Sequence, residues 1–431
     1  MIRDTKPSYN LKVVVRETGI KPDTLRAWER RYNLPAPERT AGGHRLYSQH
    51  DLETIRWLLA RQREGHSISH AVQLWRDMEA GGGDPLQQST IPPSAAPTAA
   101  PAADLTVFRE AWIRACLAFD ETAADQQLAH ALAWHAPEVV CVELLQKGLA
   151  QIGQMWYENR ATVQQEHFAL AIALRRVNTL LAAAPPPSRA QLILLACPPE
   201  EEHTFPLLLL ALLLRYRGWP VAYLGANVPL AQMESALQAT RPALAVLAAQ
   251  TLPTAAETLT MARFFQAHGT RLAYGGYVFN RQPTLRRQMP GYYLGETMAA
   301  AMTGVADILN AGPPMPTGTP TPIPHQQALA EFDKQHWLLE AHVWRTLQTE
   351  QWSEAHLRVA NLHLDRYIRA ALTFGDMGLI DQELDWLRQL LAHHGVSGDF
   401  LKRYLVIYAQ AAHEYLDESG RPIIDWLDAH A

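Results

Sequence analysis

A histidine that follows two glutamates carries the clearest metal-binding chemistry in this sequence. His203 comes directly after Glu201 and Glu202, just beyond the apolar run 191–197 that is typical of a buried strand. Ligands of open α/β sheets bind beyond the carboxyl ends of the strands. An imidazole there can coordinate a metal ion, and a carboxylate beside it can fix its tautomer and raise its basicity. The residues alone fit equally well a solvent-facing histidine beside a helix-capping acidic cluster.

A tryptophan and a Glu-His pair form a second candidate set. Trp156 precedes Glu166 and His167 by ten and eleven residues, which is about three helical turns. Taken alone, such a set more often marks ordinary core and surface positions than a binding site. The sequence around it is helical in pattern, so we expect both ends of the set to lie on helices.

The first 65 residues carry side chains that suit a nucleic acid. They contain 13 Lys/Arg and 8 Asp/Glu, a net charge near +5, although the whole chain carries −5. Such a basic segment is attracted to phosphate. Residues 11–19 predict a short helix that ends at Gly19, and Pro22 starts a second helix where proline is tolerated. Two short helices around a glycine turn predict a helix-turn-helix.

The second helix and the segment after it contain the side chains that we expect to reach DNA bases and phosphates. Residues 39–47, RTAGGHRLY, predict a β-wing with Gly42 and Gly43 at its tip. Ser48 or Asp51 caps the helix that follows. The predicted DNA-binding residues are Thr24, Arg26, Arg30, Arg31, Arg39, His44, Arg45 and Tyr47.

These elements belong to a chain of 431 residues, which is long enough for several domains. Two Pro/Ala/Gly-rich stretches interrupt the apolar periodicity and are typical of linkers. Residues 104–183 are helical in pattern, and residues 325–431 are helical again. Between them, residues 190–311 alternate short apolar runs with helical patterns, which predicts a parallel α/β sheet. We expect domains at 1–80, 104–185, 186–311 and 325–431, joined by linkers at 81–103 and 312–324.

Cysteine usage and hydropathy bear on localisation. Three widely spaced cysteines and no CxxC pair favour a reducing cytoplasm, and the N-terminus lacks the apolar core of a signal peptide. The run LLLLALLL at 207–214 is too short to span a bilayer and predicts a buried helix. We therefore expect a cytoplasmic protein without a membrane partner.

The N-terminal block closely resembles the MerR family of DNA-binding regulators over about 70 residues. The motif is matched by Thr18-Gly19-Ile20, Thr24-Leu25-Arg26, Trp28-Glu29-Arg30-Arg31-Tyr32, Arg39, Arg45, Tyr47 and Asp51-Leu52. Asn33 stands where the family often has glycine, and asparagine tolerates a positive φ. The resemblance implies a winged helix-turn-helix that binds a double-stranded operator. The helical pattern fades near Glu79, which leaves little room for a dimerising coiled coil and favours a repressor whose later blocks form the homo-oligomer, a dimer or a tetramer.

The two candidate sets together resemble the cobalamin-binding, light-sensing regulators related to CarH and LitR. That group joins a MerR head to a four-helix bundle with a W-x9-E-H motif and a Rossmann-like domain with (E/D)-x-H-x-x-G. The resemblance spans residues 1 to about 310. The matches are Trp156, Glu166 and His167 to the first motif, Glu201 and His203 to the second, and Gly275 and Gly276 to a later G-G element. Pro206 replaces the glycine of the second motif, and residues 249–252 lack the serine of an S-x-L element.

The resemblance implies adenosylcobalamin as the cofactor. His203 is then the lower axial ligand of cobalt, and Gly275 and Gly276 let the nucleotide tail approach the backbone. Light cleaves the cobalt–carbon bond in that family, and the oligomer and its DNA complex fall apart. The best-known members have a histidine directly after the tryptophan that takes the vacated cobalt position, where this chain has tyrosine. The implied upper-face pocket is formed by Trp156, Tyr157, Glu166 and His167.

Residues 325–431 go beyond the usual regulators of this kind. They contain nine histidines and many aromatic residues but no cysteine. An extra helical oligomerisation bundle is one interpretation. The pattern of residues 364–396 also resembles the globin-like helical domains that bind a linear tetrapyrrole, which implies noncovalent biliverdin or another bilin.

The sequence thus predicts a multidomain regulator rather than an enzyme, with a MerR-type winged helix-turn-helix, a four-helix bundle, a Rossmann-like α/β cobalamin-binding domain and a C-terminal all-α domain. We expect a light-responsive transcriptional repressor. Three alternatives stay open: a sensor of cobalamin level, a corrinoid methyl carrier or methyltransferase module, and a protein that senses light only through its last block. The basic head argues against the second, because a methyl carrier has no need to bind DNA.

Overall fold

The computed structural model describes residues 8–18, 20, 22–39, 45–63, 68–80, 104–348, 354–393 and 398–431. The chain divides into two compact units, residues 1–100 and residues 101–431. Each unit is described by itself below. No helix of the described residues is long and apolar enough to cross a membrane.

The N-terminal unit is a small helical domain with a three-stranded antiparallel sheet in the order β1-β3-β2. Its elements are β1 (Tyr9–Asn10), α1 (Leu11–Thr18), α2 (Pro22–Tyr32), β2 (Glu38–Arg39), β3 (Arg45–Tyr47), α3 (Gln49–Arg63) and α4 (Ile68–Ala80). Pro22 is the first residue of α2, as predicted. Asn33 has a φ of 51°, which confirms the left-handed turn after α2. The predicted winged helix-turn-helix is therefore confirmed, although Gly19 and the wing tip lie outside the described residues.

The predicted cap of α3 is reciprocal. The backbone N–H of Ser48 donates to Asp51 Oδ2 at 2.8 Å, and the backbone N–H of Asp51 donates to Ser48 Oγ at 3.1 Å. Each side chain therefore satisfies a backbone donor that the start of the helix leaves open. This cap fixes where the chain passes from the wing strand β3 into α3.

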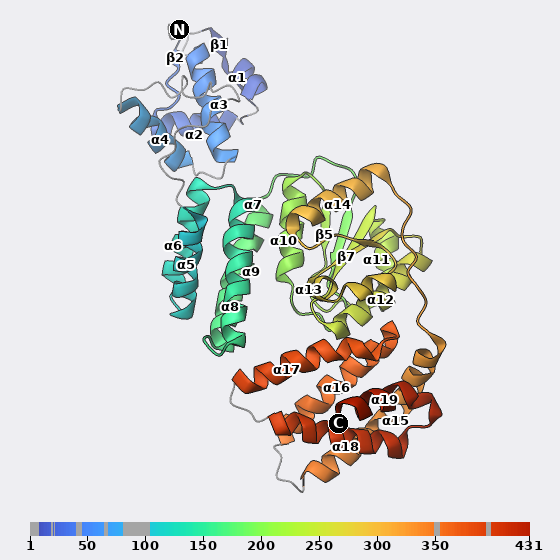
Figure 1. The fold of residues 1–431 in the computed structure, drawn as a ribbon. Coiled ribbons are helices and arrows are strands. Elements are labelled where there is room, and N and C mark those ends of the chain that lie inside the picture. The colour runs from blue at the N-terminus through green and yellow to red at the C-terminus, as the bar shows by residue number, and fades with distance from the viewer. Residues whose placement is uncertain are drawn as a thin grey trace. The chain divides into compact units, whose positions relative to one another are not determined.

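The second unit begins with a helical bundle of four long segments (Figure 1). These are α5 (Leu105–Leu117), α6 (Glu121–Trp134), a continuous rod of α7 (Pro137–Val140), the π-helical turn Cys141–Gln146 and α8 (Lys147–Tyr157), and α9 (Val163–Ala183). Thr162 and Gln165 cap α9 reciprocally, at 3.2 and 2.8 Å. That cap sets the position of the first turn of α9, which contains Glu166 and His167.

The bundle is followed by a five-stranded parallel sheet with strand order β5-β4-β6-β7-β8. Its strands are β4 (Ile193–Ala196), β5 (Val221–Tyr223), β6 (Leu244–Ala248), β7 (Leu272–Gly275) and β8 (Tyr292–Tyr293). The main helices between them are α10 (Phe205–Tyr216), α11 (Met233–Thr240), α12 (Leu252–Ala267), α13 (Tyr277–Arg281) and α14 (Met298–Ala311). One face of the sheet packs against α10 and α14 and the other against α11 and α12. All strands therefore end at one edge, and the chain order changes direction beside β4.

The predicted buried helix at 207–214 is confirmed as the middle of α10. Every residue from Leu207 to Leu214 is buried. Leu208 and Leu212 belong to the apolar core of the bundle, whereas Leu207 and Leu210 belong to the core beneath the sheet. A helix that is apolar on all sides is explained by burial between two cores.

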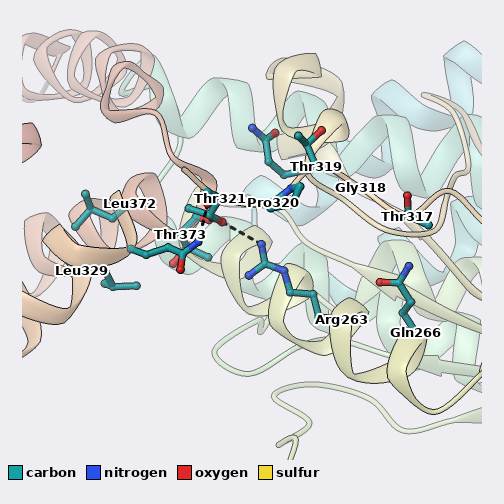
Figure 2. A pocket seen from close by; sticks show the side chains of 12 residues that line it. Arg263, Gln266, Thr317, Gly318, Thr319, Pro320, Thr321, Leu329, Leu372 and Thr373 are labelled. Carbon is teal, nitrogen blue, oxygen red and sulfur yellow. Dashed lines mark hydrogen bonds between the residues drawn. The ribbon is translucent and has the colours of Figure 1, made fainter. Parts of the chain in front are cut away.

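The described part of the C-terminal block is entirely helical, with α15 (Ile323–Gln348), α16 (Glu354–Phe374), α17 (Asp381–His393), α18 (Gly398–Tyr415) and α19 (Arg421–His430). One buried apolar cluster runs from α12 into these helices. Residues 312–322 have no regular secondary structure. Figure 2 shows how they pack on both neighbours: Arg263 Nη2 of α12 donates to Thr321 Oγ1 at 3.0 Å, and that hydroxyl donates to the Thr373 carbonyl of α16 at 2.6 Å.

Candidate functional site

The loop between β4 and α10 contains a histidine that is held by a buried carboxylate. Glu201 is fully buried, and its Oε1 accepts hydrogen bonds from the backbone N–H of His203 at 2.9 Å and from His203 Nδ1 at 2.7 Å. Its Oε2 accepts from the backbone N–H of Gln250 and from Thr254 Oγ1, both at 2.7 Å. The carboxylate thus ties the loop after β4 to the start of α12.

These hydrogen bonds set the charge state of the pair. Burial alone opposes ionisation of Glu201, but hydrogen bonds from His203 and Thr254 outweigh it and lower the pKa of the carboxyl. The hydrogen bond to Glu201 raises the pKa of His203, burial opposes this, and the charges of Glu201, Glu166 and Glu202 add to the increase. An ionised Glu201 accepts the Nδ1 proton, so Nε2 is the nitrogen left to bind a metal.

The proline that replaces the motif glycine is compatible with this loop. The helix α10 begins at Phe205, so Pro206 lies in its first turn. An N–H at that position has no partner within the helix, which is why proline is tolerated there. The side chain of His203 remains 63% exposed beside the carboxyl ends of the strands. Pro206 therefore does not prevent the geometry that the motif predicts for His203.

The two glycines after β7 have different explanations. Gly276 has a φ of 119°, and a Cβ there would collide with the backbone carbonyl of Ala249. The fold itself therefore requires glycine at this position. A Cβ on Gly275 would meet only the Cβ of Leu294, at 4.0 Å, so the fold would tolerate a side chain there. Gly275 therefore leaves open space at the carboxyl end of β7.

Gln250 was not predicted as a site residue, yet the structure places it between the two parts of the site. Its backbone donates to Glu201, and its Oε1 accepts from the backbone N–H of Tyr277 at 3.1 Å. Its Nε2 is buried and has no hydrogen-bond partner within the described part of the chain. A buried donor without a partner at the end of β6 is the kind of group that a bound cofactor can satisfy. The position after a strand end was the available signal for Gln250 and for Thr254.

The second predicted set lies where the bundle faces this loop. Trp156 is half-buried near the end of α8, and Glu166 is half-buried in the first turn of α9. His167 is exposed, and its Nε2 lies 3.6 Å from Glu166 Oε2. The charge of Glu166 on α9 contributes to the raised pKa of His203, so Glu166 lies within electrostatic range of that imidazole. An open Gly275, an unsatisfied Gln250 donor and a free imidazole nitrogen together fit a corrinoid with a nucleotide tail.

Tyr157 is placed differently from the prediction that it lines the upper-face pocket. Its hydroxyl donates to Gln389 Oε1 at 2.7 Å, and its ring stacks on Trp386 with a centroid distance of 5.8 Å. His393 lies edge-on to the same ring at 5.1 Å, and its Nδ1 donates to the Tyr157 carbonyl at 2.9 Å. The Tyr157 ring therefore contacts α17 of the C-terminal helices.

Half of the residues predicted to bind DNA lie exposed on α2. Thr24, Arg26, Arg30 and Arg31 are all exposed on α2. Exposed threonine and arginine side chains on a second helix of this kind are the types that contact base edges and phosphates. The side chain of Arg39 and the whole of His44 lie outside the described residues.

The prediction for Tyr47 needs correction, because this residue lies inside the domain, whereas Arg45 is partly exposed and also pairs with Glu29. Tyr47 is fully buried, and its hydroxyl donates to Glu29 Oε1 at 2.6 Å. Burial and this hydrogen bond raise the pKa of Tyr47. Arg45 Nε pairs with Glu29 Oε2 at 2.6 Å. The prediction that Tyr47 contacts DNA is wrong: Tyr47 and Arg45 join β3 to α2 through Glu29.

Two known protein families match separate parts of the chain. Residues 9–77 match the MerR HTH family regulatory protein model, and residues 109–181 match the B12 binding domain model. The first match covers the helix-turn-helix and the second covers the helical bundle. The combination defines a class of proteins in which a DNA-binding head is joined to a B12-binding domain.

Similarity to whole proteins identifies the family. The chain is 32% identical over 272 residues to the HTH-type transcriptional repressor CarH of Myxococcus xanthus, covering 62% of this chain and 89% of that protein. It is also 32% identical over 243 residues to the repressor CarA of the same organism, covering 56% of this chain and 76% of that protein. The monomethylamine corrinoid protein of Methanosarcina barkeri matches with a TM-score of 0.39 and 15% identity, over 47% of this chain and 99% of that one. This chain belongs to the CarH/CarA family of HTH-type transcriptional repressors.

Proposed function

We propose that this protein is a light-responsive transcriptional repressor that binds an operator through α2 and senses light through adenosylcobalamin. The observation that carries the proposal is the buried Glu201, which holds His203 so that one imidazole nitrogen is free at the edge of the sheet. The family and the exposed basic face of α2 support the DNA-binding half. Operators of this kind are read by two heads, so we further propose a homo-oligomer that acts in the cytoplasm.

The residues of the proposed site lie on two walls, one formed by the loops at the end of the sheet and the other by the helical bundle. His203 would be the lower axial ligand of cobalt, with Glu201 as the partner that fixes its tautomer. Gly275 and the Gln250 Nε2 would receive the nucleotide tail. Adenosylcobalamin, when bound, supplies a cobalt–carbon bond that light cleaves. Trp156 and Glu166 would cover the upper face and exclude water, together with His167.

An absorption spectrum of the purified protein with adenosylcobalamin, before and after green light, tests the proposal. We expect a protein-bound spectrum that changes irreversibly in light, with loss of operator binding in a gel-shift assay of the same sample. His203→Ala should give a base-off spectrum without a histidine ligand. His130→Ala, at an exposed position on α6, is the matched control and should keep the native spectrum. An unchanged spectrum in His203→Ala would show that His203 is not the ligand.

The same samples separate the alternatives. A sensor of cobalamin level would change its operator affinity with added cobalamin but not with light. A methyl carrier would accept a methyl group on the cofactor, and its cofactor state would not alter operator binding. A response to red light alone, in protein that retains no cobalamin, would assign light sensing to the last block.

We also propose that the C-terminal helices hold a bilin. A mainly apolar cavity of about 290 Å³ lies between α16, α17 and α18, and its lining includes His356, His363, Leu387 and Phe400. Burial lowers the pKa of His363 to about 4, so its imidazole is neutral at neutral pH. A neutral imidazole in an apolar wall can accept a hydrogen bond from a pyrrole N–H.

Addition of biliverdin to the purified protein tests this second proposal. We expect a red or far-red absorption band that survives gel filtration, because a bound tetrapyrrole is held away from solvent. His363→Ala should weaken or shift that band. His413→Ala, an exposed histidine of α18, is the control and should not. If biliverdin does not bind native protein, and gel filtration shows a dimer or tetramer that fails to form after removal of residues 325–431, the block is an oligomerisation bundle.

A further inference from the structure

The loop that contains His203 is held by the C-terminal helices as well as by the sheet. Glu200 directly precedes the buried Glu201, and its carboxylate forms an ion pair with Arg366 Nη2 of α16. Glu200 has a φ of 64°, and its backbone N–H donates to Asn227 Oδ1 at 2.9 Å. A left-handed conformation is unfavourable for a residue other than glycine, so the surroundings must hold it. Arg366 is part of those surroundings.

Arg366 offsets the negative charge of nearby carboxylates. Burial and the charge of Glu200 raise the pKa of Glu257 on α12, and Arg366 opposes this increase. The ion pair between Glu200 and Arg366 therefore lies in the electrostatic surroundings of Glu257. The Arg366 side chain is 35% exposed and the Glu200 side chain is 54% exposed, so water weakens this ion pair. Without Arg366, the carboxylate of Glu200 would lose its ion-pair partner on α16, next to the residue through which Thr254 attaches the loop to α12.

The opposite wall of the site touches the C-terminal helices through a separate contact. Trp156 is followed by Tyr157, whose ring and hydroxyl contact Trp386 and Gln389 of α17. Asn159 Nδ2 also donates to the His393 carbonyl at 3.3 Å. The end of α8 that contains Trp156 is thus supported by α17, while the His203 loop is supported by α16.

We infer that the C-terminal helices complete the cobalamin site, with Arg366 as a positioning residue for the His203 loop and Trp386 as the support of the Trp156 end of α8. This inference rests on the proposed binding of cobalamin at His203. Neither residue is among those that we propose to hold the cofactor. Arg366 acts through Glu200, and Trp386 acts through Tyr157.

The test of Arg366 measures cobalamin binding to the full chain. Arg366→Gln is compared with native protein by titration with adenosylcobalamin in the dark and by the spectrum of the bound cofactor. Partners of metal ligands typically change metal affinity about 10–100-fold. Arg366 acts one contact further away, through a partly exposed ion pair, so we expect a Kd about 2–5-fold higher. Part of the bound cofactor should show the base-off spectrum. Arg366→Lys should restore most of the affinity, because it keeps the charge.

The control on the same helix is Arg358→Gln, which removes an exposed ion pair with Glu354 and should leave both measurements unchanged. Glu200→Gln approaches the contact from the other side and should reproduce the effect of Arg366→Gln, even if one of the two variants folds poorly. The double variant should lose no more affinity than either single variant, because both remove one interaction. Equal Kd and equal spectra for Arg366→Gln and Arg358→Gln would overturn the role of Arg366.

The upper wall has a different signature. Trp386→Ala should raise the Kd several-fold while the spectrum keeps its histidine ligand, because the His203 loop is untouched. Trp337→Ala, at a tryptophan of α15 that is 59% exposed, is the matched control. Unchanged affinity in Trp386→Ala would refute the support of α8. The proposed function fails if native protein binds no cobalamin or if His203→Ala leaves the spectrum unchanged. The inference alone fails if native protein binds cobalamin and His203→Ala changes the spectrum, but the Arg366 and Trp386 variants match their controls.

Discussion

Replacement of the buried Glu201 by glutamine tests the centre of the site. Each carboxylate oxygen of Glu201 accepts two hydrogen bonds, from the backbone and ring of His203 on one side and from Gln250 and Thr254 on the other. Glutamine has one carbonyl oxygen, so in either orientation its NH₂ group faces two donors. The Thr254 hydroxyl can turn to the Thr251 carbonyl at 3.1 Å, but a buried backbone N–H cannot.

The magnitude follows from these contacts. Hydrogen bonds to a charged group contribute about 1.5–3 kcal/mol each, and a buried donor left without a partner costs about 1–3 kcal/mol. Because glutamine restores one side of the pair, we expect Glu201→Gln to lower the free energy of unfolding by about 2–4 kcal/mol. The Kd for cobalamin should rise about 10–100-fold, since Glu201 orients the proposed ligand.

Urea unfolding of the cofactor-free protein and cobalamin titration measure the two effects. Glu202→Gln is the control, because Glu202 is the adjacent exposed carboxylate. The folded-state pKa of Glu201 is lowered from 4.5, so its contribution is complete above about pH 4.5 and is lost as the pH falls through the folded-state value. The difference between native protein and Glu201→Gln should therefore shrink in acid. Equal urea midpoints for the Glu201 and Glu202 variants at pH 7 would refute the reasoning.

Three further predictions concern other parts of the chain. Glu29→Gln should destabilise the N-terminal unit by about 1–3 kcal/mol and weaken operator binding in a gel shift, because Glu29 holds Tyr47 and Arg45 in place. An unchanged thermal unfolding midpoint would contradict this role of Glu29. Burial raises the pKa of Asp365 from 3.8 to about 6, against the opposing ion pair with Arg369 Nε at 2.8 Å. The native urea midpoint should therefore fall relative to that of Asp365→Asn as the pH rises from about 4 to about 6, and parallel pH curves would exclude this titration. Burial raises the pKa of each of the three cysteine thiols to about 12, so a thiol reagent should modify none in folded protein and all three after unfolding; rapid labelling of the native protein would disagree with that burial.

Features that depend on neighbours along the chain could be predicted from the sequence. Pro22 at the start of α2 and Asn33 with a positive φ follow from the backbone preferences of proline and asparagine. The alternation of apolar runs and helical patterns predicted the parallel sheet, and the fixed geometry of such sheets placed His203 at its carboxyl edge. The Glu201–His203 contact joins residues two apart, so the motif alone was enough to predict it.

Features that depend on distant residues could not be predicted in this way. A tyrosine on a wing strand can face DNA or the core, and the partner that decides the case for Tyr47 is Glu29, 18 residues earlier. Tyr157 and Gln389 are 232 residues apart, and no periodicity relates them. Gln250 and Thr254 were missed because an amide or hydroxyl after a strand has many uses, and only the position of Glu201 selects one.

The position of α10 explains why a movement of the bundle, which covers the upper face of the site, would displace His203. The helix begins two residues after His203, and its side chains belong alternately to the core of the bundle and to the core beneath the sheet. A shift of the bundle against the sheet must therefore either move α10 or separate packed apolar surface, which costs about 25 cal/mol for each Å² exposed. Moving the start of α10 displaces the loop that Glu201 and Arg366 hold from the other side. The His203 loop is thus connected to the bundle, to the sheet and to the C-terminal helices. A change in the position of any one of them should alter the position of the imidazole.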